Sequence, residues 1–258
     1  MELNPVLIVV GMGLAGLLGW WRVFPHLRSL QTTETSRDGV WLALIGYVVM
    51  SLVVWLLAGQ LQGASLVRLM TLQALACLLG VGAMLILAGR RRAGLSALGL
   101  RTHRGPPAPL VAVFAWLAFF PIFLVIVWLN QKVLGSMGVE IAVQNNLQRF
   151  LDEDGARTSI LAWTAMIAVI PACEELIFRG GLFGGMRRAL HPMAAMLISS
   201  VLFGLMHEPT YLVPTAALGF ALAFLYECTG SLSVPFLFHG LHNGLTLLIA
   251  SLYPDSFS

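Results

Sequence analysis

Two acids and an arginine follow directly on an apolar stretch in the second half of the chain. Residues 159–172, SILAWTAMIAVIPA, carry no charge and lead into CEELIFRGG, which contains Glu174, Glu175 and Arg179. An ionised group at the centre of a bilayer costs at least about 2.5–3.5 kcal/mol on insertion scales, so such groups normally face an interior cavity and take part in function. These charges mark the region where chemistry is expected.

Two later segments also place polar side chains in apolar runs. FGLMH contains His207, and HGLHN contains His239 and Asn243. His239 and Asn243 are four residues apart, so a helix carries both on one face. His242 points mostly away from that face, and we interpret it as a packing residue.

The two acids are expected to have different roles. Glu175 and Arg179 form an i,i+4 pair in the acid-first order that stabilises helices, which indicates a structural pair. Glu174 is rotated by about 100° and stays free for chemistry. A helical hairpin turning near His191 would bring Glu175 and His207 to the same depth, because each lies 16 residues from His191. The candidate catalytic residues are therefore Glu174, His207, His239 and Asn243.

This set of side chains fits hydrolysis by activated water. A carboxylate can act as a general base, an imidazole can orient the water, and a second imidazole with an amide can donate hydrogen bonds to a tetrahedral oxyanion. Glu174, His207 and His239 could equally hold one Zn²⁺ with a coordination position open for water. Both the metal-free mechanism and the zinc mechanism stay open at this point.

The elements that position these residues must lie in a membrane. The chain has 258 residues, of which 58% are hydrophobic and 10% are charged, and its mean hydropathy is +0.85. Soluble domains are roughly 45–50% apolar and 25% charged. Only helices and closed barrels satisfy the backbone in lipid, and the long continuous apolar runs favour helices. We predict an all-α, polytopic bundle that forms one integral membrane domain over residues 1–258.

Stretches without Asp, Glu, Lys or Arg predict about eight membrane spans, since each needs about 20 residues. The spans are residues 3–21, 39–67, 69–89, 105–131, 158–173, 189–206, 209–226 and 228–254. Residues 1–130 hold the first four spans and no recognisable motif, whereas residues 158–254 hold the four spans with the candidate site. We expect the fifth helix to continue beyond its apolar run, toward His191.

The arginines predict the orientation. The loop with Arg90, Arg91, Arg92, Arg101 and Arg104 is assigned to the cytoplasm by the positive-inside rule. Alternation of the spans then puts most of the 15 Lys and Arg on that side and both termini outside the cytoplasm. The net charge of +3 is explained by this topology and indicates no nucleic-acid partner.

The longest extracytoplasmic segment, residues 131–157, contains EIAVQNNLQRFLDEDG. Its apolar residues are spaced as in an amphipathic helix, which we expect to lie in the membrane interface.

The polar segments resemble, in order and spacing, the motifs of one family. EELIFR, FGLMH and HGLHN are similar to the E-E-x-x-x-R, F-x-x-x-H and H-x-x-x-N motifs of the CAAX prenyl protease and bacteriocin-processing (CPBP, or Abi) family of intramembrane proteases. The likeness covers about residues 158–250. It implies a cell-membrane endopeptidase in which Glu174 and His207 activate water, while His239 and Asn243 stabilise the oxyanion. Glu175, Arg179 and Phe203 then have supporting roles.

The resemblance implies a membrane-associated peptide or protein as substrate and the lipid bilayer as surroundings. The family is described both as metalloproteases and as metal-independent glutamate proteases, so one divalent metal, zinc, and a metal-free mechanism stay equal alternatives. Neither the substrate's identity nor the oligomeric state follows from the sequence.

Two other classes of function use the same residues. A transporter could employ the buried Glu and His side chains as a proton or ion relay, and would be expected to show inverted repeats, which are not found. A non-catalytic scaffold of the same fold would not need complete motifs.

Overall fold

The computed structural model describes residues 5–26, 38–57, 63–90, 98, 100, 103, 105–139, 145–153 and 159–253. These residues are predominantly helical, and no strand occurs among them. The prediction of an all-α membrane protein is confirmed. The chain divides into two compact units, which are described separately below. Unit 1 comprises Met1–Thr33, Arg101–Ile141 and Pro192–Phe238; unit 2 comprises Glu34–Leu100, Ala142–His191 and His239–Ser258.

Five helical stretches among the described residues are long and apolar enough to cross a membrane. They are α2 (Asp38–Leu56), α4 (Leu66–Gly89), α5 (Ala108–Ser136), the continuous stretch Ile160–Met186 and the stretch Pro209–Thr229. Ile8–Val23, within α1 (Pro5–Val23), and α11 (Pro192–Leu205) are apolar but shorter. Polar side chains lower the hydropathy of α13 (Ser233–Leu252), which is not among the five. The count of eight spans, the domain division and the orientation of the termini stay predictions.

Caps and turns place several helix ends away from the predicted limits. The run 39–67 is not one helix, because α2 ends at Leu56 and Ser65 caps α4 by accepting a hydrogen bond from the backbone of Arg68. Gly63, with φ of 67°, belongs to the connection between them. Likewise α12 (Leu212–Thr229) runs past Glu227 and ends at Gly230, which adopts the left-handed conformation. The positions of charged residues predict roughly where the membrane spans lie, whereas capping interactions decide at which residue each helix ends.

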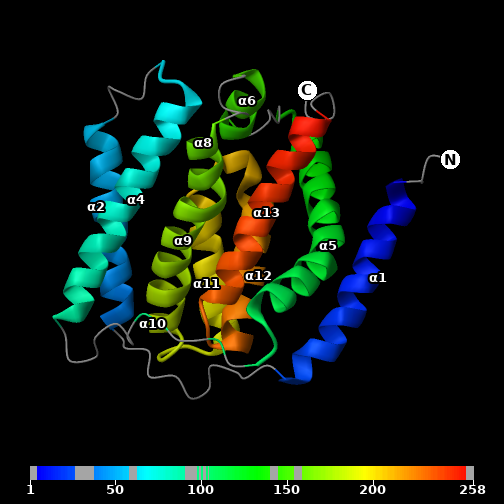
Figure 1. Cartoon of the computed structure of the whole chain (residues 1–258), viewed down its shortest axis with the longest axis horizontal. Coiled ribbons are helices and arrows are strands. Elements are labelled where there is room, and N and C mark those ends of the chain that lie inside the picture. The colour runs from blue at the N-terminus through cyan, green and yellow to red at the C-terminus, as the bar shows by residue number, and fades with distance from the viewer. Residues whose placement is uncertain are drawn as a thin grey trace. The chain divides into compact units, whose positions relative to one another are not determined.

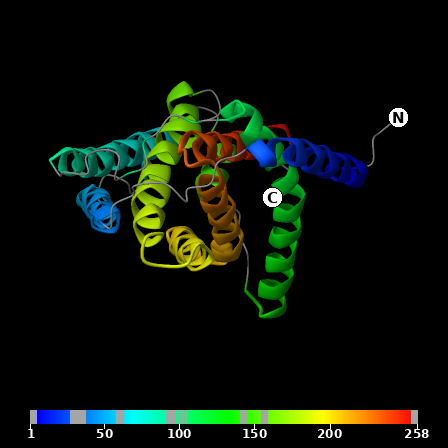
Figure 2. The ribbon, with the colours of Figure 1, turned by 90° about the horizontal axis from the view of Figure 1, so that it is seen from below.

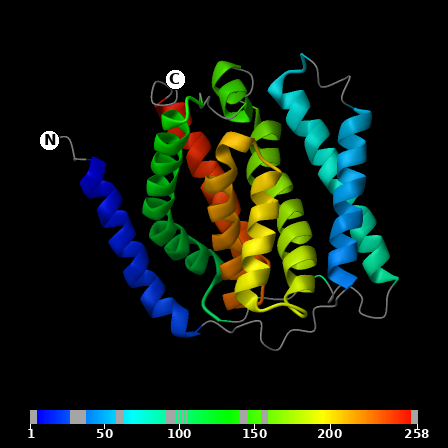
Figure 3. The same ribbon diagram turned by 180° about the vertical axis from the view of Figure 1, so that it is seen from behind.

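Small residues bring the helices of unit 1 together. Gly16 and Gly19 of α1 face α5 so closely that an added Cβ would collide with Leu117 and Ala118 or with Phe114. The α11 and α12 helices lie side by side (Figure 3). A Cβ on Gly204 would lie 2.7 Å from the carbonyl oxygen of Leu212. Such close backbone approach is typical of membrane helix pairs.

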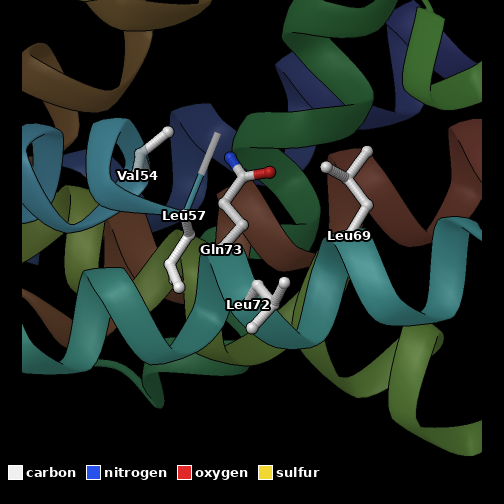
Figure 4. Close-up of a pocket in the computed structure, with 5 residues that line it drawn as sticks. All are labelled: Val54, Leu57, Leu69, Leu72 and Gln73. Carbon is white, nitrogen blue, oxygen red and sulfur yellow. The ribbon is translucent and has the colours of Figure 1, made fainter. Parts of the chain in front are cut away.

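Unit 2 is built on the same principle. The α2 helix lies beside α4 (Figure 2), and also packs on the end of the Ile160–Met186 stretch, where a Cβ on Gly39 would lie 2.8 Å from the carbonyl oxygen of Gly181. Val54, Leu57, Leu69, Leu72 and Gln73 line a pocket between α2 and α4 (Figure 4). None of the predicted site residues lines this pocket, so it is not the candidate site.

The amphipathic helix predicted within residues 131–157 is present as α6 (Asn145–Asp152). Ile141 of that pattern lies outside the described residues. Phe150 is fully buried and packs edge to face on Trp163, while Glu153 accepts a hydrogen bond from the backbone N–H of Leu66 at 2.7 Å. The α6 helix therefore docks on the helix ends of its own unit, which periodicity alone did not indicate.

The fifth helix continues to Met186, as expected, but it is not a regular α-helix. It consists of α8 (Ile160–Thr164), the π-helical segment η4 (Ala165–Val169), α9 (Ile170–Glu175), the π-helical segment η5 (Leu176–Phe183) and α10 (Gly184–Met186) (Figure 1). Both acids end α9, directly before η5. Segments of π-helix are rare and are frequently found at functional sites, because they re-aim the side chains around them.

Candidate active site

The carboxylate of Glu175 connects two helices of unit 2. Its Oε1 accepts a hydrogen bond from Arg179 Nη1 at 2.8 Å and lies 2.9 Å from Nδ1 of His239 on α13. Glu175 and Arg179 are each 1% exposed. The i,i+4 pair that the sequence indicates is present, and the third member of the chain is His239. The spacing of residues along the chain does not predict the contact between Glu175 and His239, because that contact depends on how α13 packs.

The contact with Glu175 assigns the tautomer of His239. An ionised carboxylate only accepts hydrogen bonds, so Nδ1 of His239 carries the proton and donates it to Oε1. The other ring nitrogen, Nε2, then lies toward Glu174, 3.8 Å from its Oε2. That separation is short enough for an ion pair and too long for a direct hydrogen bond. One imidazole thus lies between the two acids.

The two acids differ in their access to solvent. The side chain of Glu174 is 21% exposed, whereas that of Glu175 is 1% exposed. Glu175 already has two polar partners, the guanidinium and the imidazole. Glu174 is therefore the more accessible of the two acids.

Asn243 has a structural contact that its predicted role did not include. Its Nδ2 donates to the backbone carbonyl of Met166 in η4 at 3.0 Å. In a π-helix this carbonyl would accept from the residue five positions on, which is Pro171 and has no N–H. Asn243 supplies the missing donor and so ties α13 to the fifth helix. An amide NH₂ has two donors, so one is left for another acceptor.

Close contact between backbones also holds α13 against η4. A Cβ on Gly240 would lie 2.5 Å from the carbonyl oxygen of Ile167, so no side chain fits next to His239. The buried position of His242 on the same helix agrees with its interpretation as a packing residue.

Gly240→Ala is expected to push α13 away from η4 and to lower the free energy of unfolding by about 1–3 kcal/mol, the usual cost of overpacking. Thermal unfolding in detergent would measure this. Gly244→Ala is the matched control, because its Cβ would meet Ile167 Cγ2 at 3.6 Å, an ordinary van der Waals distance. Equal melting temperatures for both variants would contradict the close contact at Gly240.

Phe203 and His207 belong to unit 1. His207 follows the end of α11, and its Nδ1 lies 2.9 Å from the carbonyl oxygen of Phe203. A carbonyl only accepts, so Nδ1 carries the proton and the neutral ring has its lone pair on Nε2. Phe203 is fully buried and its ring lies 4.9 Å from that of His207. The structure brings Glu174, Glu175, Arg179 and His239 into contact within unit 2. Asn243 lies four residues further along α13 and contacts Met166. The approach of His207 to Glu174 stays a prediction.

The residue types at the site include ligands that zinc accepts. Glu174 and His239 of unit 2 are two such donors. Among the described residues, however, no group of three His, Cys, Asp or Glu side chains is arranged to hold a metal ion. The third donor of the predicted zinc set, His207, belongs to unit 1, so zinc and a metal-free mechanism stay equal alternatives.

The fold and the site define a class: a helical membrane protein with a chain of acid, imidazole and guanidinium groups inside its helices. Residues 156–245, which contain all seven predicted site residues, match the family model of the type II CAAX prenyl endopeptidase Rce1-like proteins. This part of the chain is therefore similar to that family of prenyl endopeptidases. The resemblance drawn from the motifs is confirmed.

One curated relative agrees with this family. Over 105 residues the chain is 33% identical to the putative membrane peptidase YdiL of Bacillus subtilis (strain 168). The matched residues are 40% of this chain and 42% of that protein, so the chain covers less than half of the relative's length. No solved structure matches the chain.

Proposed function

We propose that the protein is an intramembrane endopeptidase that hydrolyses a peptide bond of a membrane-associated protein or peptide. The observation that carries this proposal is that two acids with different exposure lie on either side of one imidazole. Glu175 is buried and bonded to Arg179 and His239, whereas Glu174 is partly exposed and lies beside Nε2 of His239. The match of residues 156–245 to a family of membrane peptidases supports the same conclusion.

In the proposed reaction Glu174 takes a proton from water, which His207 helps to orient through the lone pair on Nε2. The resulting hydroxide forms a C–O bond to the peptide carbonyl. When the tetrahedral intermediate collapses, the C–N bond breaks and Glu174 returns the proton to the leaving amine nitrogen. Atoms and protons balance, and general acid–base catalysis of this kind contributes about 10²–10⁴-fold to the rate.

The developing oxyanion needs hydrogen-bond donors. The second N–H of Asn243 is one, since the first is bonded to Met166. His239 can donate from Nε2 when both of its ring nitrogens carry protons, with its Nδ1–H bonded to Glu175. Removing one oxyanion donor typically costs about 10²–10³-fold in kcat.

The proposal is tested with purified protein in detergent or vesicles and a fluorogenic peptide with one membrane-spanning segment. Wild type is expected to cleave it, and His207→Ala is expected to lose cleavage while keeping its melting temperature. If wild type transported protons or ions across vesicles and cleaved nothing, the relay alternative would replace the protease.

A separate experiment addresses the metal. Water activation by Glu174 alone requires no metal, so under this mechanism we expect cleavage to continue, within about twofold, after treatment with a chelator strong enough to remove zinc from proteins. Metal content measured in the same sample is the control. Loss of activity on chelation with recovery on added zinc would overturn the metal-free mechanism and leave the peptidase proposal intact.

A further inference from the structure

The segment that carries His207 is irregular, and its backbone must be held by something other than a helix. The α11 helix ends at Leu205, and the N–H groups of Met206 and His207 bond to carbonyls three residues back. A 3₁₀ turn, η6 (Pro209–Tyr211), then leads into α12. Non-helical backbone at membrane depth is tolerated only where its polar groups find partners.

One carbonyl in this segment loses its ordinary donor to a proline. If α12 were extended back through Thr210, the carbonyl of Thr210 would accept from the N–H of residue 214, but that residue is Pro214, which has no N–H. An unpaired carbonyl away from water costs free energy comparable to a lost hydrogen bond. The connection between His207 and α12 therefore needs a donor from elsewhere.

That donor comes from α5. Nδ2 of Asn130 lies 2.8 Å from the carbonyl oxygen of Thr210 and donates to it. Both residues belong to unit 1, and α5 packs on α12 there. Asn130 is the first of three polar residues, with Gln131 and Lys132, that follow the apolar part of α5. It lies outside residues 156–245, which match the family model.

The other contacts of the segment leave it little freedom. Gly204 lies against Leu212 and Ala216, and Gly219 lies against Phe203. His207 Nδ1 is bonded to the Phe203 carbonyl. These contacts hold the end of α11. The hydrogen bond from Asn130 to Thr210, three residues after His207, holds the connection where it enters α12.

We propose that Asn130 is a positioning residue for His207: its amide replaces the donor that Pro214 removes and holds the connection in which the imidazole is oriented. This inference rests on the proposed function. It assigns a role in the reaction to α5, one of the spans for which the sequence showed no motif. Asn130 acts through the backbone of Thr210 and touches no reacting atom.

The test is a double-mutant cycle with Pro214. Asn130→Leu keeps the size of the side chain and removes the donor. It is expected to lower kcat by roughly 10-fold to 100-fold, with KM within about twofold, because a misplacement of about 1 Å can cost about 10²-fold. Pro214→Ala restores a backbone N–H opposite Thr210, so in that background Asn130→Leu should lower kcat by no more than about threefold. An equal loss in both backgrounds, or no loss in either, would overturn the proposal.

Gln131→Leu is the matched control, since it removes an exposed amide from the next position of the same helix. A second readout needs no catalysis: hydrogen exchange of the peptide covering residues 204–213. Exchange should rise about 10-fold or more in Asn130→Leu, stay unchanged in Gln131→Leu, and return toward wild type in Asn130→Leu with Pro214→Ala. Unchanged exchange in Asn130→Leu would refute the positioning role. If wild type cleaved no peptide while exchange behaved as expected, the proposed function would fail and the structural role of Asn130 would stand.

Discussion

Glu174→Gln is expected to lower kcat for peptide cleavage by about 10³-fold or more, because the amide cannot take a proton from water. The change is nearly isosteric and affects the more exposed of the two acids, so the melting temperature should stay within a few degrees of wild type. Single-turnover cleavage of a membrane-spanning fluorogenic peptide measures the rate.

Glu227→Gln is the matched control, since it makes the same chemical change near the C-terminal end of α12, 17 residues along the chain from the Thr210 carbonyl that Asn130 contacts. Its cleavage rate should equal that of wild type. A Glu174→Gln protein that cleaves as fast as the control would remove Glu174 from its role as the general base and with it the mechanism proposed above.

The second large effect concerns the buried ion pair of Glu175 and Arg179. Arg179→Met leaves the Glu175 carboxylate without its counter-ion in a site that is 1% exposed. Removing one partner of a buried ion pair typically costs about 3–5 kcal/mol, because the other charge stays buried and uncompensated. We expect the variant to unfold at a markedly lower temperature in detergent, or to be recovered from membranes in lower yield.

The double variant Glu175→Leu with Arg179→Met separates stability from function. Both charges are gone, so most of the lost stability should return, as it often does when a buried ion pair is replaced by apolar residues. The cleavage rate should remain roughly 10²-fold or more below that of wild type, because Nδ1 of His239 has lost the acceptor that sets its tautomer. The loss of an orienting acid on a catalytic histidine can cost up to about 10⁴-fold, as in serine proteases.

The pH profile of the double variant provides the readout that a purely structural pair would not change. If Glu175 only neutralised Arg179, the double variant would regain both stability and activity, and its pH profile would match wild type. A shifted or flattened profile, with stability restored, is the result that the Glu175–His239 contact predicts.

Hydropathy and spacing were sufficient for much of the fold because they report local properties. The apolar runs predicted helices, and the charged residues marked where spans approximately end, although within the run 39–67 α2 ends at Leu56 and α4 begins at Leu66. Caps such as Ser65 and Gly230 decide those ends through one or two hydrogen bonds, which a hydropathy average does not detect.

The candidate site was predictable to the level of residue types. The i,i+4 spacing of Glu175 and Arg179 indicated their pair, and the motifs indicated His239 and Asn243. The contacts of His239 with both acids and of Asn243 with Met166 were not predictable in this way. Pro171, inside an apolar run, was the available signal for the second contact, because it announces a carbonyl that needs another donor.

By itself, the sequence determined that this chain is a helical membrane protein, and it predicted that the acids, imidazoles and amide form one site, since such groups are costly to bury in hydrocarbon without partners. The tertiary structure decided which atom meets which. Two π-helical segments shift the phase of the fifth helix around Glu174 and Glu175, and Gly240 allows α13 to approach η4 until its backbone meets Ile167. These contacts depend on close packing between segments more than 60 residues apart, as the separation of 64 between Glu175 and His239 shows, and no local pattern encodes such a distance.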